Sequence, residues 1–220
     1  MLSRIASTLV PAFGRLSVTV DPGAEFTPGS LIVANHTSLM DPAVVLAALH
    51  RLGTEPLIMA AAGLWRTPLL GRALTREGHV PVYRGDRRAA AALDTAAEQL
   101  ERGRLVLIYA EGGLPSRKDV AEAAPGTFRS GVARLVERTG SPVVPVGQAG
   151  ARRITSGSIA KQVAGMATAP LRRPTLHVHV GTPVELTGDH AERTTVAHTA
   201  VTAAWRTAAS RLGEPAALAA

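Results

Sequence analysis

The sequence predicts an α/β fold, a central mixed and largely parallel β-sheet flanked by helices. Short runs rich in β-branched residues alternate along the chain with alanine-rich stretches of helical period, and such alternation is typical of a sheet covered by helices. The chain has 220 residues, 46% of them hydrophobic, enough to bury one sizeable core. We find no internal repeat or low-complexity linker, so we expect one domain over residues 16–212, a short helix over 1–15 and a frayed tail over 213–220.

Each expected element has a local signal. The strands are predicted where short apolar, β-rich runs occur, at residues 16–20, 30–34, 56–60, 78–82, 104–109, 142–146 and 175–180. The helices are predicted where apolar residues recur at helical spacing, at residues 42–52, 64–74, 87–102, 128–139 and 190–212. Gly103 follows the third of these helices, where a glycine C-cap is expected.

The first residues carry Arg4 followed by apolar positions, with Pro11 dividing the run and Arg15 ending it. This pattern lacks the cleavage site of a targeting segment. It fits an amphipathic helix that lies in the headgroup region of a membrane, and it fits equally a terminal helix packed on the core. No uninterrupted apolar run approaches the about 20 residues of a membrane-spanning helix, so we expect none.

Composition excludes several kinds of site. The chain has no cysteine, which removes disulfides, thiolate nucleophiles and cysteine metal sites. Its net charge is +7, and all but two of its 24 basic residues are arginines. Such charge suits nucleic acid, an anionic membrane surface or a phosphorylated substrate. Only seven Phe, Trp and Tyr are present, too few for base-stacking platforms, so we expect no nucleic-acid partner.

The most informative segment holds His36 and Asp41, with four residues between them, directly after an apolar strand. An imidazole titrates near neutrality, and a carboxylate on its second nitrogen fixes the tautomer, so the pair predicts a proton-abstracting device. Asp41 followed by Pro42 also fits a helix N-cap with proline at the first helical position. His50 and Glu55 repeat the spacing at a helix end, and we assign them no chemistry.

His177 and His179 alternate on a predicted strand and therefore share one face, a spacing that is compatible with metal ligation. No third ligand cluster accompanies them in the sequence. We interpret them as structural histidines and predict no catalytic metal and no cofactor.

Four blocks in this order resemble the glycerophospholipid acyltransferase family, the lysophosphatidic acid acyltransferases in particular. The His-x4-Asp box follows the Leu-Ile-Val-Ala-Asn strand at residues 31–35. Residues 78–84, Gly-His-Val-Pro-Val-Tyr-Arg, match the acceptor-binding strand of the family. Glu111 and Gly112 match the core of its Pro-Glu-Gly-Thr-Arg box, and residues 141–146 match its late proline-containing strand.

The resemblance implies a glycerolipid acyltransferase-like fold and site residues at matching positions. His36 would be the general base and Asp41 its partner; Arg84, Glu111 and Gly112 would bind substrate. The third box departs from the family, because Gly113 and Leu114 replace its threonine and arginine. Arg117, three residues later, is therefore a further substrate-binding candidate. A sugar, a polyol or another acceptor without phosphate would explain the loss equally.

The implied activity is transfer of a fatty acyl group from acyl-coenzyme A or acyl carrier protein to a lysophospholipid hydroxyl. No Gly-x-Ser-x-Gly elbow occurs and cysteine is absent, so direct transfer is favoured over a covalent acyl-enzyme. A non-catalytic lipid-binding relative is the rival from another class. We expect a cytoplasmic protein, peripheral on the inner face of the cell membrane. Residues 152–173 fit either a mobile flap over an acyl chain or an ordinary helix with loops.

Overall fold

A seven-stranded sheet forms the centre of the computed structural model, which describes residues 1–83, 88–114 and 121–213. The strands follow the order β1-β7-β6-β2-β5-β3-β4 across the sheet. All neighbouring pairs are parallel except β6 and β7. The strand bounds are β1 Arg15–Val20, β2 Leu31–Ala34, β3 Leu57–Ala61, β4 Val80–Val82, β5 Val106–Tyr109, β6 Val143–Ala149 and β7 Thr175–Val180.

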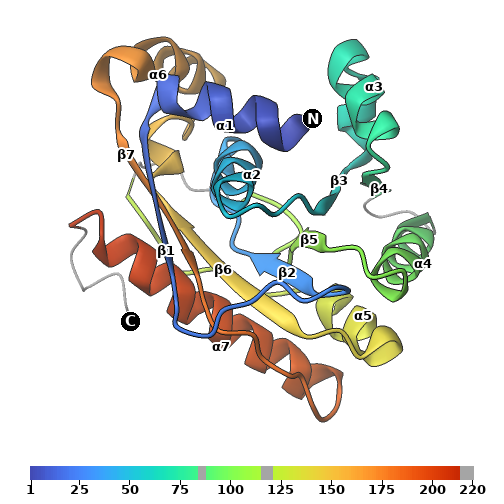
Figure 1. The fold of residues 1–220 in the computed structure, drawn as a ribbon. Coiled ribbons are helices and arrows are strands. Elements are labelled where there is room, and N and C mark those ends of the chain that lie inside the picture. Colours follow the sequence, from blue (N-terminus) through green and yellow to red (C-terminus); the bar gives the residue numbers. More distant parts are fainter. Residues whose placement is uncertain (84–87, 115–120, 214–220) are drawn as a thin grey trace.

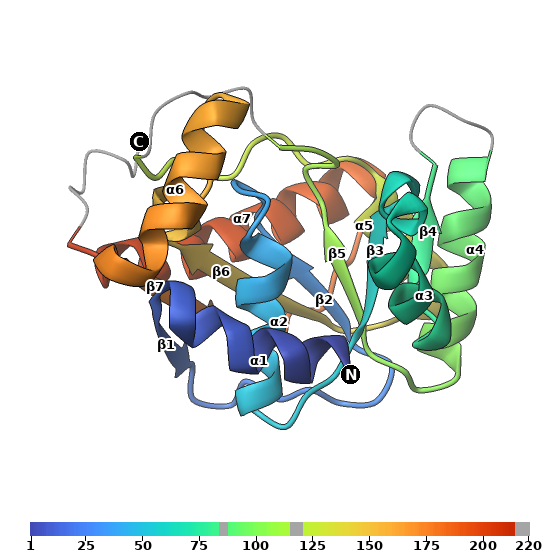
Figure 2. The ribbon, with the colours of Figure 1, turned by 90° about the horizontal axis from the view of Figure 1, so that it is seen from above.

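Helices cover both faces of this sheet, as Figure 1 shows from the side. The helices α1, α2, α3 and α6 lie on one face, and Figure 2 looks down onto this layer. The helices α4, α5 and α7 cover the other. The helix bounds are α1 Leu2–Phe13, α2 Asp41–Arg51, α3 Pro68–Arg76, α4 Arg88–Glu101, α5 Gly131–Thr139, α6 Ile159–Arg172 and α7 His190–Ser210, with short 3-10 helices η1 Ala62–Arg66 and η2 Ala151–Arg153.

The strand β2 lies in the middle of the core because all four of its side chains are fully buried. Ile32 and Ala34 contribute to the apolar cluster under α1, α2 and α6, whereas Leu31 and Val33 contribute to the cluster on the opposite face. Such burial on both faces explains why β2 reads as an uninterrupted apolar run. In register, Ala34 faces Tyr109 of β5 and Val146 of β6, so β2 and β5 end side by side while β6 runs on past them to Ala149.

These elements confirm the predicted fold class and most of the predicted strands and helices. The helix predicted over residues 64–74 is wrong as a single element. Thr67 has an extended backbone, because a residue before proline avoids the helical region, and it divides η1 from α3. The helix predicted over 128–139 begins only at Gly131. Residues 152–173 contain η2 and the ordinary helix α6; whether they move stays untested.

The N-terminal segment forms α1, which packs on the core through Ser3, Ala6 and Val10. The N–H of Leu2 donates to both carboxylate oxygens of Glu77, at 3.0 and 3.1 Å, and so ties the start of α1 to the end of α3. The helix therefore packs as a terminal helix would, while Ile5 and other apolar side chains on it stay exposed. Among the described residues, no helix is long and apolar enough to cross a membrane.

One glycine controls how closely α7 approaches the sheet. Gly147 in β6 is buried, and a Cβ placed there would lie 2.1 Å from the carbonyl carbon of Ala204 and 2.2 Å from the N atom of Trp205. Both neighbours are backbone atoms of α7, which cannot yield without moving the helix. The backbone contact therefore requires glycine at this position.

We expect Gly147→Ala to lower the free energy of unfolding by about 2 kcal/mol or more, because overpacking would displace α7. Chemical denaturation monitored by circular dichroism would measure the loss. Gly63→Ala is the matched control, since no atom lies within 4 Å of its added Cβ and its stability should be unchanged. Equal stability of the two variants would contradict this packing.

Candidate active site

The predicted base and its partner lie where β2 ends and α2 begins. His36 follows the strand by two residues, and Asp41 is the first residue of α2. Met40, and not Asp41, holds the N-cap position, with a proline in the first turn after it. The interpretation of Asp41 as a simple N-cap is therefore wrong, because its carboxylate turns back toward the segment that precedes the helix.

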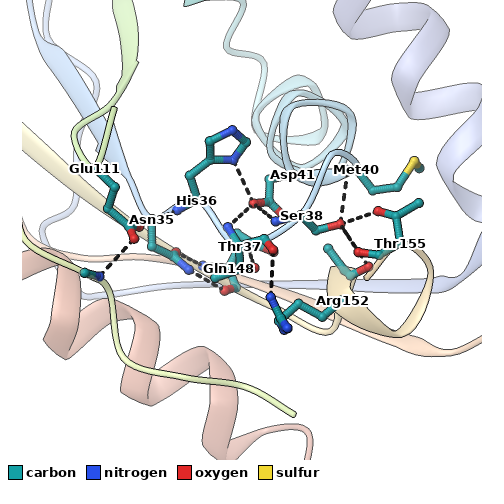
Figure 3. A network of polar contacts seen from close by, with 12 residues as sticks. Asn35, His36, Thr37, Ser38, Met40, Asp41, Glu111, Gln148, Arg152 and Thr155 are labelled. Carbon is teal, nitrogen blue, oxygen red and sulfur yellow. Dashed lines mark hydrogen bonds and ion pairs between the residues drawn. The ribbon is translucent and has the colours of Figure 1, made fainter. Parts of the chain in front are cut away.

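The side chains of His36 and Asp41 are in direct contact. Nδ1 of His36 lies 3.0 Å from Oδ2 of Asp41, and the His36 ring stands 4.5 Å from the ring of Tyr109. The His36 side chain is 12% exposed and the Asp41 side chain is fully buried. A proton on Nδ1 shared with the carboxylate leaves Nε2 as the acceptor of the neutral ring. Figure 3 shows the pair from close by.

The carboxylate of Asp41 accepts hydrogen bonds from the turn that carries His36. Its Oδ2 accepts from the N–H of Thr37 at 2.5 Å and of Ser38 at 2.8 Å, besides its contact with the imidazole. Burial raises the pKa of the Asp41 carboxyl, and these bonds act in the opposite sense. Its other oxygen, Oδ1, has no hydrogen-bond partner among the described residues, and neither has the buried hydroxyl of Tyr109.

A second set of polar side chains holds this turn from the β6 side. Asn35 accepts from the backbone N–H of Gln148 at 2.8 Å and donates to its carbonyl at 3.1 Å. The Gln148 amide donates to the Thr37 hydroxyl at 3.0 Å, and Nη1 of Arg152 donates to the Thr37 carbonyl at 3.0 Å. Each polar group of Thr37 therefore has a buried partner, and the turn has a fixed shape.

Ser38 anchors the same turn to the segment before α6. Its hydroxyl contacts the Thr155 hydroxyl at short range and lies 3.0 Å from the carbonyl of Thr155 and 3.2 Å from that of Ala151. The N–H of Met40 donates to the Ser38 hydroxyl at 3.2 Å. The loop that leads into α6 is thus part of the support of the site.

Glu111 lies beside His36 at the end of β5, as its place after a parallel strand predicts. Its Oε1 accepts from the backbone N–H of His36 at 2.7 Å, and its Oε2 accepts from the N–H of Gly126 at 2.9 Å. Burial raises the pKa of the Glu111 carboxyl. Because both oxygens bond backbone groups, the geometry favours a supporting role. Its contact with an acceptor stays a prediction.

Gly112 has φ +70°, a left-handed conformation that favours glycine. A Cβ at Gly112 would also lie 2.5 Å from Cδ and Nε of Arg129, so the arginine side chain covers this glycine. Arg84 and Arg117, the two arginines that the sequence proposed, lie outside the described residues. Arg129, which sequence reasoning missed, brings a basic side chain to the Glu111–Gly112 turn.

A further buried carboxyl lies behind the site. Glu122 is fully buried, and its Oε1 accepts from the N–H of Gly150 at 2.8 Å. Burial raises the pKa of Glu122 to about 7, while the bond from Gly150 and the nearby Arg152 act in the opposite sense. No pattern in the sequence distinguishes this glutamate from a surface residue.

The other histidine pairs have partners of their own. Ser17 lies 2.6 Å from Nδ1 of His177, and Thr19 lies 2.9 Å from Nε2 of His177 and 2.9 Å from Nδ1 of His179. Asp21 lies 3.3 Å from Nε2 of His179. These contacts between β1 and β7 agree with a structural role. Within the described part of the chain, no group of three or more acidic or histidine side chains could hold a metal.

The His50 and Glu55 pair also forms, with Nδ1 of His50 3.0 Å from Oε1 of Glu55. Its side chains are 32% and 53% exposed, against 12% and 0% for His36 and Asp41. The same spacing thus gives a solvated ion pair at one place and a buried pair at the other. Burial, which spacing does not reveal, separates the two.

Comparison with known proteins agrees with the fold and with the residue blocks. Residues 18–148 match the family model described as Acyltransferase. The crystal structure of PlsC from Thermotoga maritima, a 1-acyl-sn-glycerophosphate acyltransferase, has the same fold, with a TM-score of 0.70 and 18% sequence identity. The alignment covers 96% of this chain and 78% of that one. The family match thus defines the class of this protein, that of the acyltransferases.

Two curated relatives are similar in sequence. The chloroplastic 1-acyl-sn-glycerol-3-phosphate acyltransferase BAT2 of Brassica napus is 30% identical over 137 residues, which cover 60% of this chain and 37% of that protein. A protein of Mycoplasma genitalium described as a probable 1-acyl-sn-glycerol-3-phosphate acyltransferase is 30% identical over 118 residues, 53% of this chain and 42% of its own length. The matched segments thus span well under half of these relatives. The chain belongs to the acyltransferase family.

The raised pKa of Glu122 predicts a pH-dependent stability. The carboxyl keeps its proton up to about pH 7 in the folded protein but only up to about its ordinary value of 4.5 in the unfolded chain. The free energy of unfolding should therefore fall as the pH rises from 4.5 to 7, by at most about 3 kcal/mol. Glu122→Gln should remove the share of this fall that Glu122 contributes and leave that of Asp41 and Glu111, whose pKa values burial also raises, as urea denaturation at successive pH values would show.

Glu185→Gln, which removes an exposed carboxylate, is the control for Glu122→Gln and should leave the pH dependence as it is in the original protein. If Glu122→Gln retained the whole fall in stability between pH 4.5 and 7, the assigned burial of the carboxyl would be wrong.

Proposed function

We propose that this protein transfers a fatty acyl group from acyl-coenzyme A or acyl carrier protein to a hydroxyl of a lysophospholipid that resembles 1-acyl-glycerol-3-phosphate. The observation that carries the proposal is the buried contact between His36 and Asp41 at the sheet edge of an acyltransferase-family chain. The names of the similar proteins support the choice of acceptor. We further propose that residues 16–212 form the catalytic domain.

In this mechanism Nε2 of His36 accepts the proton of the acceptor hydroxyl while its oxygen attacks the thioester carbonyl. Asp41 keeps the proton on Nδ1 and stabilises the imidazolium that forms. The tetrahedral intermediate then collapses, so that the new ester C–O bond is kept and the C–S bond breaks. The departing thiolate takes the proton from Nε2, which returns His36 to its neutral form. No step requires a metal or a covalent acyl-enzyme.

An acceptor without phosphate is the second candidate, and one observation favours it. Gly113 and Leu114 stand where the glycerophospholipid acyltransferase family has threonine and arginine. Arg129 supports the phosphate-bearing acceptor instead, because its side chain lies against Gly112 and offers a guanidinium that suits phosphate in two-point contacts. The buried His36 and Asp41 pair favours either enzyme over a non-catalytic lipid-binding relative.

Location is also a proposal. We place the protein in the cytoplasm, on the inner face of the cell membrane, where a lysophospholipid acceptor would be found. The net charge of +7 supports this placement because anionic headgroups attract basic surfaces.

His36→Ala should lower kcat/KM for acyl-coenzyme A and lysophosphatidate by about 10³-fold or more, because it removes the proposed general base. Thiol release from acyl-coenzyme A, followed with a chromogenic reagent, is the measurement. His50→Ala removes a histidine of equal spacing from an exposed pair and should keep full activity. Turnover by His36→Ala at the original rate would refute the assigned base.

Arg129→Gln should raise KM about tenfold for a phosphate-bearing acceptor and leave KM for a monoacylglycerol unchanged, because only phosphate forms the charged contact. Initial rates with both acceptors would measure the difference. Arg134→Gln, at an exposed arginine of α5, is the matched control. An equal change for both acceptors would exclude a phosphate contact by Arg129.

A further inference from the structure

Two separate side chains hold the turn that carries His36. On the β5 side, Oε1 of Glu111 accepts from the N–H of His36 at 2.7 Å. On the β6 side, Nη1 of Arg152 donates to the carbonyl of Thr37 at 3.0 Å. Figure 3 shows Glu111 and Arg152 on opposite sides of the turn. The direction of the His36 ring therefore depends on two supports that come from different parts of the chain.

The arginine is placed by the short helix η2. Arg152 is 2% exposed and lies in the middle of η2, which begins directly after Gly150. Gly150 has φ +96°, and a Cβ there would lie 2.2 Å from a backbone oxygen of β7, so the chain needs glycine at this position. The carbonyl of Ala151 lies 3.2 Å from the Ser38 hydroxyl. The helix η2 thus contacts the turn at both Thr37 and Ser38.

The buried carboxyl of Glu122 holds the start of η2. Its Oε1 accepts from the N–H of Gly150 at 2.8 Å, and the side chain is fully buried. A buried N–H that loses its acceptor costs about 1–3 kcal/mol, so this bond resists change. Because Gly150 is the residue from which η2 begins, the bond fixes where Arg152 starts to reach toward the turn.

The segment that carries Glu122 also joins the two supports. The N–H of Gly126, four residues after Glu122, donates to Oε2 of Glu111 at 2.9 Å. Chain and hydrogen bonds therefore form a closed ring around the turn, which passes through His36, Glu111, Gly126, Glu122, Gly150, Arg152 and Thr37. A closed ring transmits a displacement at one member to the others, so the position of Glu122 bears on that of the base.

We propose that Glu122 is a positioning residue for His36, which acts by holding η2 against the turn between His36 and Asp41. The catalytic part of this role rests on the proposed function, whereas the geometric part rests on the contacts alone. The role needs the reach and the acceptor oxygen of the side chain, and it does not need a charge.

The surroundings of Glu122 agree with a role that needs no charge. Burial raises the pKa of Glu122 to about 7, so the carboxyl is partly neutral at neutral pH. Asp41 acts on this pKa in the same direction as burial, and the bond from Gly150 and the nearby Arg152 act in the opposite one. A neutral amide of the same length should therefore serve as well as the carboxyl.

The rate of acyl transfer by Glu122 variants tests this role. Glu122→Ala should lower kcat at least about tenfold, since a displacement of about 1 Å can cost as much as 100-fold, and KM should stay within about twofold. Glu122→Gln keeps an acceptor oxygen at the same reach and should retain kcat. Glu122→Asp is too short to accept from Gly150 and should resemble Glu122→Ala. Glu98→Ala, at an exposed glutamate of α4, is the control and should keep full activity.

A second measurement needs no turnover. The proton that Nδ1 of His36 shares with Asp41 should give a downfield resonance in proton NMR, which is assigned by its loss in His36→Ala. The resonance should persist in Glu122→Gln and be lost to exchange with water in Glu122→Ala. A residue that served only stability would leave kcat and this resonance unchanged in a folded variant, and thermal unfolding would verify the fold.

Two results would overturn the proposal. One is a folded Glu122→Ala or Glu122→Asp protein with the original kcat. The other is a fall in kcat in Glu122→Gln equal to that in Glu122→Ala, which would assign the effect to charge.

Failure of the proposed reaction would look different. If the original protein released no thiol from acyl-coenzyme A, the reaction would be refuted and the His36 resonance alone would decide. Its loss in Glu122→Ala would leave the positioning of His36 standing, and its persistence there would overturn it.

Discussion

The buried carboxylate of Asp41 is the constraint on which the site depends. One oxygen of this group receives two backbone N–H groups of the turn and the imidazole of His36. A buried carboxylate without such partners would cost several kcal/mol, so the turn and the charge stabilise each other. The backbone around Thr37 and Ser38 cannot change shape without leaving the Asp41 carboxylate short of donors. The direction of the His36 ring follows from that shape.

Side chains from neighbouring elements also hold the backbone of this turn by hydrogen bonds. Glu111 holds the backbone of His36 from β5, and Arg152 holds that of Thr37 from the β6 side. Each support is itself buried or partly buried, and each reaches a backbone group rather than another mobile side chain. Backbone partners have little conformational freedom to lose, so the arrangement is rigid before any substrate binds.

Sequence alone predicts the parts of this site that are local. The His36 and Asp41 contact spans five residues, and the apolar run of β2 marks the strand that carries it. The contacts of Gln148 and Arg152 with the same turn span 111 and 115 residues, so no short pattern could reveal them. Gln148 is the last residue but one of β6, which is parallel to β2, and a polar residue near the end of such a strand is a signal that could have been used. The helix α6 shows a different limit of sequence reasoning. Its apolar residues Ile159, Val163 and Leu171 are exposed, and a helical period identifies an apolar face without saying whether the face turns inward.

The segments that surround His36 lie far apart in the chain, and this has a consequence for folding. His36 and Asp41 can meet in a chain that has formed only β2 and the first turn of α2, but both would then remain in water. The dry environment of the pair arises when β5 and β6 add to either side of β2. These pairings close long loops, which form late and slowly. A partly assembled chain would therefore hold the His36 and Asp41 contact in water, and only the completed sheet would bury it.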